Sequence, residues 1–499
     1  MRGSGIKFAA GVILGATLLA APEEALSLPS FARQTGQPCG KCHTDFPGLT
    51  PFGRQFKLGG YTLGGGDYRT TLFSEPSPED SKKALMNYLP TKTPSASSAI
   101  ATATSPDTSQ VWVPPISMME IIGFTHTQAP QDPTGSPWDA NNNTTISPFS
   151  VFWGGAFSEH TGAFMQLTYN TAGMGMPPDA FANKHWTWDN TDIRYANSGK
   201  LGDLDVSYGI TVNNNPTVQD LWNSTPAWDF FSYVTSPVAP APSAKTIIDG
   251  ALAAHVGGVG AYAYINNLLY VELAGYKTVS FGDQLKLGTD PFGAPGLFSD
   301  VAPYWRVALE PQWGNNYWEF GTFGMISHIK PWVDGTGFTS LATFPQSDKY
   351  TDVGFDSQYQ YQADKYWLTL RGTYIRETQK LDSSSLNSGT NPTDKLNTFR
   401  GYASIAYGDD NKIVLSGQYF RTWGSTDTAQ FSFGSKGVPN STGWIGEIAY
   451  IPFGVSKAPI WPWFNARLGV RYIYYNEFDG DRTMAHANNT VFVYLWMAQ

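Results

Sequence analysis

The two cysteines of this 499-residue chain lie in one short C-x-x-C-H motif, formed by Cys39, Cys42 and His43. Thiols at this spacing can form thioether bonds to the vinyl groups of one haem, and the histidine that follows can ligate the iron. A redox-active disulfide is one alternative, but no βαβ pattern surrounds the motif. A zinc site is another, but it needs further ligands, and the next histidine is His126. The motif predicts one covalently attached haem c, with His43 as the proximal ligand.

Residues 1–27 predict an export signal. Arg2 and Lys7 precede an apolar run over residues 8–19, and small residues at 25–27 fit a cleavage site, with 20–21 as the alternative. The run is too short for a transmembrane helix. Export agrees with haem c, which is attached outside the bacterial cytoplasm.

The composition after this signal is not that of an ordinary soluble enzyme. Aromatic residues make up 15 % of the chain, charged residues only 15 %, and there are 51 glycines. The net charge of −9 comes without a basic patch, which argues against a nucleic-acid partner. An exported chain rich in aromatics and glycine predicts an outer-membrane β-barrel. A large secreted β-sandwich or propeller is the alternative.

Residues 112–499 show a succession of hairpins. Polar side chains such as Asp352, Asp356 and Gln358 alternate with apolar ones such as Val353 and Phe355. This alternation over about ten residues is typical of transmembrane strands, and the segment has room for about 16 of them. Predicted strand pairs are 150–157 with 162–169, 259–265 with 268–276, 303–313 with 317–326, 352–362 with 366–376, 399–407 with 413–421, and 463–475 with 490–496. Predicted long loops are 128–145, 172–186, 213–245, 327–349, 379–396 and 422–441.

The sequence therefore predicts an all-β protein with a small cofactor segment in front. Residues 28–62 hold the C-x-x-C-H motif and are too few to build a core of their own, so we expect them to dock in the barrel lumen. Residues 63–111, rich in Gly, Ser, Thr and Pro, predict a linker. A barrel of about 16 strands has an aqueous lumen that could receive such a segment.

Three stretches around the motif carry a family resemblance: Phe31–Gly36, Cys39–His43 and Phe46–Tyr61. They look like the fused monohaem cytochrome–porins of the outer membrane of iron-oxidising bacteria. In the barrel, Asp189–Tyr195 and Asn213–Asp220 also resemble that family, although other porins carry similar hairpins.

The resemblance implies electron transfer across the outer membrane, with the haem segment entering from the periplasmic side. Extracellular Fe(II) would be the donor, and a periplasmic carrier such as a soluble cytochrome or copper protein the acceptor. Two alternatives stay open. One is a transport channel plugged by its haem segment, and the other is electron exchange with a donor other than Fe(II). The sequence also leaves a homo-oligomer open.

Several residues near the motif are candidates for contact with the haem. Cationic Arg33, Arg54 and Lys57 could pair with its propionates, although ordinary solvation is the alternative for each. Aromatic side chains have no other core in this segment and are expected to pack on the ring: Phe31, Phe52, Phe56 and Tyr61.

The distal ligand of the iron is not determined by the motif. Strand parity offers Met325, on a face with Glu319 and Phe323, and also Met118 and His126, which share a face of the first strand. Ordinary packing is the alternative for all three. A His/Met pair of axial ligands would raise the potential.

Inward carboxylates such as those of Asp220 and Glu310 could attract Fe²⁺, because hard oxygen ligands suit this cation. The alternative is that the lumen of any porin is polar. His160, in a tight turn, and His185, in a long loop, are poor candidates for ligands.

Overall fold

The computed structural model describes residues 28–64, 115–131, 138–169, 185–228, 236–332, 346–432, 436–456 and 462–499. The predicted signal peptide, and the predicted linker beyond residue 64, lie outside the described residues. The barrel begins at Ile116, close to the predicted boundary at residue 112.

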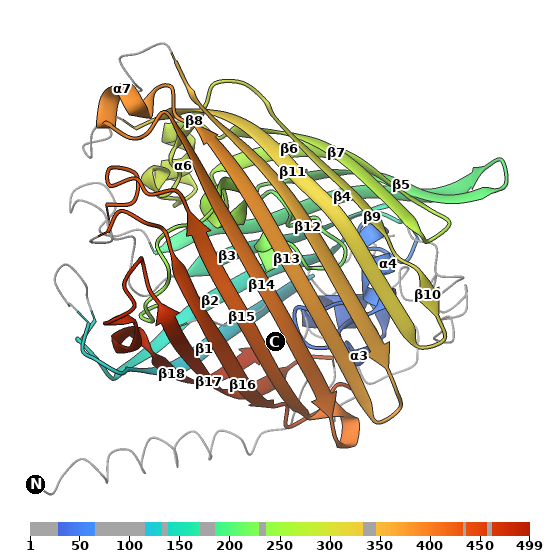
Figure 1. Cartoon of the computed structure of the whole chain (residues 1–499). Helices are drawn as coiled ribbons and strands as arrows, with labels where there is room; N and C mark the ends of the chain where they lie inside the picture. Colours follow the sequence, from blue (N-terminus) through green and yellow to red (C-terminus); the bar gives the residue numbers. More distant parts are fainter. Residues whose placement is uncertain are drawn as a thin grey trace, which may run out of the picture.

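Sixteen antiparallel strands close into a barrel (Figure 1). The sheet has eighteen strands, of which β8 (Gly296–Phe298) and β10 (Gln312–Trp313) are short additions beside β11, which leaves 18 − 2 = 16 in the ring. Each strand of the ring pairs with the next, and β18 closes on β1, from Met119 opposite Ala498 to Thr127 opposite Thr490. The ring strands are β1 (Ile116–Thr127), β2 (Asn143–Ala156), β3 (Thr161–Tyr169), β4 (Trp186–Leu201), β5 (Leu204–Asn213), β6 (Val256–Ile265), β7 (Leu269–Thr278), β9 (Ala302–Leu309), β11 (Asn316–Pro331), β12 (Asp348–Gln362), β13 (Tyr366–Lys380), β14 (Thr393–Tyr407), β15 (Ile413–Gly424), β16 (Ser441–Tyr450), β17 (Asn465–Glu477) and β18 (Thr490–Ala498).

The predicted hairpins and the strand count are confirmed, because the turn chemistry was explicit in the sequence. Asn266 and Asn267 both have φ of 50°, and Gly314 has φ of 54°. Asparagine and glycine adopt this left-handed conformation more readily than other residues, which fixes the position of a tight hairpin.

The alternation of side chains also has the predicted direction. Asp352, Asp356 and Gln358 are buried inside the barrel. The outer surface exposes apolar side chains, such as Leu273 at 72 % and Val259 at 59 %. In a closed barrel, the backbone N–H and C=O groups of every strand form hydrogen bonds with a neighbouring strand. A polar interior and an apolar exterior then present lipid-compatible side chains to the bilayer. The chain therefore has the porin-like architecture of an outer-membrane β-barrel.

The two ends of the barrel differ in the length of their connections. Short turns lie at one end, at 157–160, 202–203, 266–268, 363–365 and 408–412. The other end carries the longer connections, including α6 (Phe281–Lys286) and α7 (Ser384–Ser388). Short turns face the periplasm in barrels of this kind, which orients the molecule in the outer membrane. Among the described residues, no helix is long and apolar enough to cross a membrane.

Residues 28–64, the N-terminal segment, lie inside the barrel at the short-turn end (Figure 1, blue). The segment forms three short helices, α2 (Pro29–Thr35), α3 (Cys39–Cys42) and α4 (Pro51–Leu58). Its Phe52 and Phe56 share a buried apolar cluster with Phe152 of β2 and Trp496 of β18. The predicted docking in the lumen is thus what the structure shows, and barrel side chains provide the core that the segment lacks.

The connection from β5 to β6 differs from the prediction. It was expected as an outer loop over 213–245, but the described parts of residues 214–255, the inner loop, fold into the lumen. Val218, Leu221 and Trp222 are almost completely buried there. Because Leu221 and Trp222 pack against strand residues such as Tyr262 and Tyr270, burial of these apolar side chains holds the loop inside.

Candidate cofactor cavity

The C-x-x-C motif forms a single helical turn. Residues three apart lie on the same face of a helix, so the Cys39 and Cys42 thiols point to one side. The backbone becomes extended at His43, whose N–H still donates to the Cys39 carbonyl at 2.8 Å. The Gly40 N–H donates to the carbonyl of Val455, at the turn after β16, at 2.8 Å. The motif is therefore tied to the barrel by its own backbone.

Helix α4 packs directly on this turn. Its N-cap Thr50 accepts a hydrogen bond from the Gly53 N–H at 3.1 Å, and Pro51 occupies the first turn, where a missing N–H costs nothing. The Thr50 N–H donates to the Cys42 carbonyl at 2.9 Å. A Cβ at Gly53 would lie 2.2 Å from that same carbonyl oxygen, so only glycine permits the contact.

Gly53→Ala is expected to separate α4 from α3. The added methyl overpacks a site where the neighbouring atom is backbone, which costs about 1–3 kcal/mol. Amide hydrogen exchange across residues 43–58, followed by mass spectrometry, should become faster. Gly372→Ala is the control, because a Cβ there meets nothing within 4 Å. Equal protection in the two variants would contradict the packing argument.

A cavity of about 690 Å³ lies between the N-terminal segment and the barrel. Its lining includes Cys39, Cys42 and His43, and the other polar side chains are those of Thr35, Gln37, Lys57, Tyr61 and Asn223. Most of the remaining lining is apolar: Leu28, Phe31, Ala32, Phe46, Leu49, Phe56, Phe164 and Trp228. Phe164 belongs to β3, and Asn223 and Trp228 belong to the inner loop, so neither the segment nor the barrel forms the cavity alone.

His43 is held in a defined orientation on this cavity. Its Nδ1 lies 3.2 Å from the Gly48 carbonyl oxygen, and its ring centroid is 5.2 Å from that of Phe46. Burial lowers the pKa of His43 to about 4, against the opposing effect of the Gly48 carbonyl. The imidazole is thus neutral, and with Nδ1–H donating to Gly48 its Nε2 carries the free lone pair. This is the arrangement that metal-ligating histidines use.

The residues present fit the predicted haem. A flat apolar macrocycle needs an apolar cavity, two thiols on one side and a neutral imidazole beside them, and these groups converge here. Burial raises the pKa of Cys42 to about 12, with Cys39 acting in the same direction, so this thiol is not a reactive thiolate. The same pair is thus less suited to redox exchange than to a structural covalent link.

Three of the four aromatic residues predicted to pack on the haem lie on the cavity. Phe31, Phe56 and Tyr61 line the cavity, and the rings of Phe31 and Tyr61 stack at 5.5 Å between centroids. Phe52 is fully buried but is not part of the lining, and Lys41 Nζ lies 5.1 Å from its ring centroid.

Two of the three predicted propionate partners are placed elsewhere. Arg54 forms a buried ion pair with Glu310, and Arg33 donates to the Ile116 carbonyl at 2.5 Å, with its guanidinium 4.6 Å from the Trp463 ring centroid. Neither lines the cavity, so their interpretation as cofactor contacts was wrong. Both instead attach the segment to the barrel wall. Lys57, by contrast, does line the cavity.

None of the predicted distal ligands reaches the cavity. Met325 faces inward as predicted, but it packs in another cluster with Phe298 and Tyr304. Met118 and His126 lie on the outward face of β1, whose buried positions alternate with them. Their placement on the lumen face was wrong because both faces of β1 carry apolar residues, and the polar residues did not mark the interior. His160 and His185 also lie outside the lining.

Lys57 fastens the inner loop to the N-terminal segment. Its Nζ donates to the carbonyls of Val218 at 2.8 Å and Asp220 at 2.6 Å, and to Oδ1 of Asn223 at 2.9 Å. Three acceptors match the three N–H donors of an ammonium group. The Trp228 ring centroid lies 4.3 Å from the same Nζ, a distance at which a cation and an aromatic face attract. One side chain thus fixes the wall of the cavity that the loop provides.

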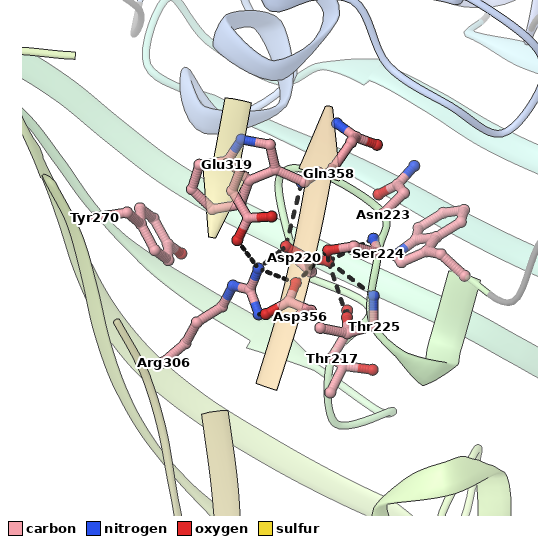
Figure 2. A network of polar contacts seen from close by, with 12 residues as sticks. Thr217, Asp220, Asn223, Ser224, Thr225, Tyr270, Arg306, Glu319, Asp356 and Gln358 are labelled. Carbon is pink, nitrogen blue, oxygen red and sulfur yellow. Dashed lines mark hydrogen bonds and ion pairs between the residues drawn. The ribbon is translucent and has the colours of Figure 1, made fainter. Parts of the chain in front are cut away.

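The inner loop is in turn bound to the barrel. Figure 2 shows Arg306 of β9 surrounded by three carboxylates, with distances of 3.2 Å to Asp220, 3.1 Å to Glu319 and 2.7 Å to Asp356. Asp220 also accepts hydrogen bonds within the loop, from the Ser224 N–H at 2.9 Å and from other groups of residues 224–225. All four charged side chains are at most 1 % exposed. The loop therefore has a fixed position.

The proposed attraction of Fe²⁺ by Asp220 and Glu310 finds no support in this geometry. Asp220 is engaged by Arg306, and Glu310 by Arg54, Trp222 Nε1 at 3.0 Å and Tyr264 Oη at 2.9 Å. Within the part of the chain that is described, no group of three or more His, Cys, Asp or Glu is placed to hold a metal ion. These carboxylates hold the fold together instead.

Hydrogen bonds attach the segment to strands on all sides of the ring. They join Ser30 N to Ser117 Oγ (2.8 Å), Ala156 N to Gln34 Oε1 (3.0 Å), Tyr61 Oη to Asp192 (2.6 Å), Tyr262 Oη to the Leu58 carbonyl (2.6 Å), Arg54 to Gln360 (2.7 Å) and Ser404 Oγ to Asp45 (2.8 Å). No sequence signal identified these partners, because each pair is separated by more than 85 residues.

Arg54→Met is expected to release the N-terminal segment. Removing one partner of a buried ion pair leaves an uncompensated charge on Glu310, at a cost of about 3–5 kcal/mol. Cleavage of the segment by trypsin in detergent should accelerate roughly 100-fold. Adding Glu310→Gln should restore part of the protection, and Lys365→Met, in an exposed turn, is the control. Unchanged cleavage in Arg54→Met would refute the anchoring role.

Comparison with known proteins shows a similarity to outer-membrane barrels of known structure, and it assigns the chain to no family. Neither a protein-family profile nor a curated protein matches the sequence. Among solved structures, the chain is similar to OmpT of Vibrio cholerae, with 9 % identity over 77 % of this chain and 95 % of that one and a TM-score of 0.38. It is also similar to Salmonella typhi OmpF in complex with daunomycin (11 %, 77 % and 97 %, TM-score 0.41) and to Pseudomonas putida OprB (13 %, 77 % and 93 %, TM-score 0.37). The barrel assignment rests on the closed strand pairing and not on these likenesses.

Proposed function

We propose that the cavity holds one haem c, linked to Cys39 and Cys42 with His43 as axial ligand. We further propose that the protein carries electrons from extracellular Fe(II) to a periplasmic acceptor such as a soluble cytochrome or copper protein. The observation that carries the proposal is the convergence of both cysteines and a neutral His43 on one largely apolar cavity at the periplasmic end of a barrel. The resemblance of the flanking stretches to fused cytochrome–porins supports the choice of Fe(II).

When bound, the haem supplies a one-electron redox centre whose potential depends on its axial ligands, hydrogen bonding and burial. The chain provides the surroundings. Phe31, Phe56 and Trp228 exclude water from the cavity, and the Gly48 carbonyl orients His43. A single one-electron centre matches a one-electron donor, and oxidation at the cell surface leaves ferric iron, which precipitates near neutral pH, outside the cell.

A stopped-flow absorption experiment tests the function. Oxidised protein in detergent is mixed with Fe²⁺ under argon, and the α-band of ferrous haem c is followed. Rapid appearance of the band is expected. If the band forms with dithionite but not with Fe²⁺, the donor is not Fe(II). If no covalent haem spectrum is present at all, the cofactor assignment fails as well.

A plugged transport channel is the second candidate function. It is favoured by further cavities in the lumen, one of which measures about 1,450 Å³. In that case the N-terminal segment would have to leave its site for solute to pass. Its bonds to strands around the whole ring argue against frequent release. Uptake of solute that depends on the haem redox state would support this second candidate.

His43→Ala is expected to leave the thioether links intact while changing the ligation of the iron. The absorption and electron paramagnetic resonance spectra should lose their low-spin features, because the imidazole beside the motif is gone. Added imidazole should restore them in part. Thr44→Ala, next in sequence, is the control and should keep the spectrum of the unmodified protein. A low-spin spectrum that survives in His43→Ala would remove His43 from the ligand set.

A further inference from the structure

Two pairs of carboxyl groups are buried in the barrel toward the end that carries the longer connections. Asp352 of β12 and Glu377 of β13 are directly opposite each other in the strand register, and each is 1 % exposed. Asp394, at the start of β14, and Asp427, in the connection after β15, are also buried. Within each pair the two side chains are in hydrogen-bond contact. Because ionised carboxylates only accept hydrogen bonds, such a contact needs a proton between the two groups.

The hydrogen-bond donors show which group of the first pair holds the proton. Glu377 accepts from the Ile247 N–H at 2.5 Å and from Gln379 Nε2 at 2.6 Å. Asp352 accepts from the Ile248 N–H at 2.9 Å on one oxygen, while its Oδ1 is buried without a donor among the described residues. Donors favour the ionised form of a carboxyl group. Glu377 is therefore the carboxylate, and the proton lies on Asp352.

The second pair has the same asymmetry. Asp427 accepts from three backbone N–H groups, those of Asn391 at 2.5 Å and of Ala429 and Gln430 at 2.9 Å each. Asp394 accepts from the side chain of Asn391 at 3.0 Å, and its Oδ2 is buried without a donor in the described part of the chain. Asp427 is thus the carboxylate, and Asp394 holds the proton.

The titratable groups around the first pair supply no net positive charge. On β12 these groups are Asp348 and Tyr350. On the inner loop the nearby group is Asp249, whose charge is balanced by Arg400 at 2.6 Å. The cross-strand neighbours on β11 and β14 are uncharged: Met325 and Leu396.

The cations at this end of the barrel point away from both pairs or are exposed. Lys245 and Lys436, in the adjacent connections, are exposed. The strand cations alternate to the outward face: Lys349, Arg376, Lys380 and Lys395. The undescribed stretches 229–235, 333–345 and 433–435 contain no Lys, Arg or His. The shared proton is therefore what prevents repulsion within each pair.

Both pairs hold the outer part of the inner loop. The first pair binds the consecutive amide groups of residues 247–248. Three residues before them, Ala244 packs with Leu396 of β14 and with Phe431. The Phe431 N–H donates to the backbone carbonyl of Asp427 at 2.9 Å, so the second pair supports the surface on which Ala244 rests.

We infer that protons close the outer end of the lumen, which faces the external medium in barrels of this kind. In an acidic medium each pair holds one shared proton, and residues 244–251 stay on the barrel wall. At higher pH each pair loses its proton to the solvent, the two carboxylates repel each other, and this part of the loop is released. The closed form binds protons that the released form gives up, so its stability falls as pH rises. The inference does not rest on the proposed function, because neither pair lines the cofactor cavity.

Amide hydrogen exchange of the full-length protein in detergent, followed by mass spectrometry, tests this closure. Exchange is measured at about pH 4.5 and about pH 8.5 and divided by the intrinsic rate at each pH, which gives a protection factor. In peptides that cover residues 244–251, protection should be at least about tenfold lower at the higher pH.

Three variants locate the effect. Asp352→Asn carries no charge and can donate permanently to Glu377, so it should keep residues 244–251 protected at both pH values. Asp394→Asn should do the same for the amide of Asn391. Asp382→Asn is the control, because this carboxylate lies at the same end in an exposed pair with Lys380, and it should follow the unmodified protein.

The outcomes distinguish local release from unfolding. Equal protection at the two pH values in the unmodified protein overturns the inference without any variant. It also fails if Asp352→Asn and Asp394→Asn lose protection as the unmodified protein does. Heat-dependent gel mobility is recorded at both pH values. A barrel that keeps this mobility while residues 244–251 lose protection is the expected result, and a barrel that unfolds as a whole at the higher pH rejects local closure.

Discussion

Cys39→Ala/Cys42→Ala protein is expected to contain no covalently bound haem. The chain has no other cysteine, so no alternative thioether can form. After denaturing electrophoresis, the haem-dependent peroxidase stain should disappear completely from the band of the unmodified protein's size. Thr44→Ala, which keeps the motif and changes a neighbouring side chain, should stain fully.

The barrel itself should survive this change. Its ring is closed by β1 and β18, and neither cysteine contributes to that pairing. The variant should therefore keep the heat-dependent gel mobility of a folded barrel. Covalent staining that persists without the cysteines would reject the interpretation of the motif. Loss of the folded barrel would show instead that the cofactor segment is needed for assembly.

Deletion of residues 28–64 is expected to open the lumen. The segment fills the short-turn end of a 16-stranded ring, and barrels of this size hold an aqueous channel when nothing fills them. Conductance in planar bilayers should rise at least about tenfold over that of the intact protein. The inner loop stays in the lumen, so a full porin conductance is not expected.

A matched variant separates plugging from general loosening. Arg54→Met keeps the segment in the chain but removes its buried ion pair, and it should give brief openings instead of a constant open level. Lys365→Met, in a turn at the same end, should stay closed. Equal conductance of the intact and deleted proteins would mean that the segment does not obstruct the path.

The barrel could be predicted well from the sequence because hairpin turns and strand faces depend on residues that are close together in the chain. A turn of two asparagines such as Asn266 and Asn267 sets a hairpin wherever it occurs, and alternation of polar and apolar residues assigns each strand face. The exception is β1, where apolar residues on both faces removed the signal and Met118 was placed on the wrong side. The number of strands followed from length alone.

The site was only half predictable, for a different reason. One short motif contains Cys39, Cys42 and His43, so the sequence alone indicates that these three residues act together. The role of Arg54 depends on Glu310, 256 residues away, and that of Lys57 on a loop that was expected outside the barrel. Composition shows that a porin lumen is charged, but it does not show which charges pair.

The burial of the proposed attachment site has a consequence for the order of assembly. Cys39 is only 4 % exposed, and the cavity beside it is closed partly by Phe164 of β3 and Trp228 of the inner loop. An enzyme that forms thioether bonds cannot reach this thiol once the segment is seated. On the proposed haem c assignment, attachment would precede insertion of the segment into its ring, and the unfinished protein would wait in the periplasm as an open chain. Pulse-labelled protein that acquires barrel mobility before it acquires haem would contradict this order.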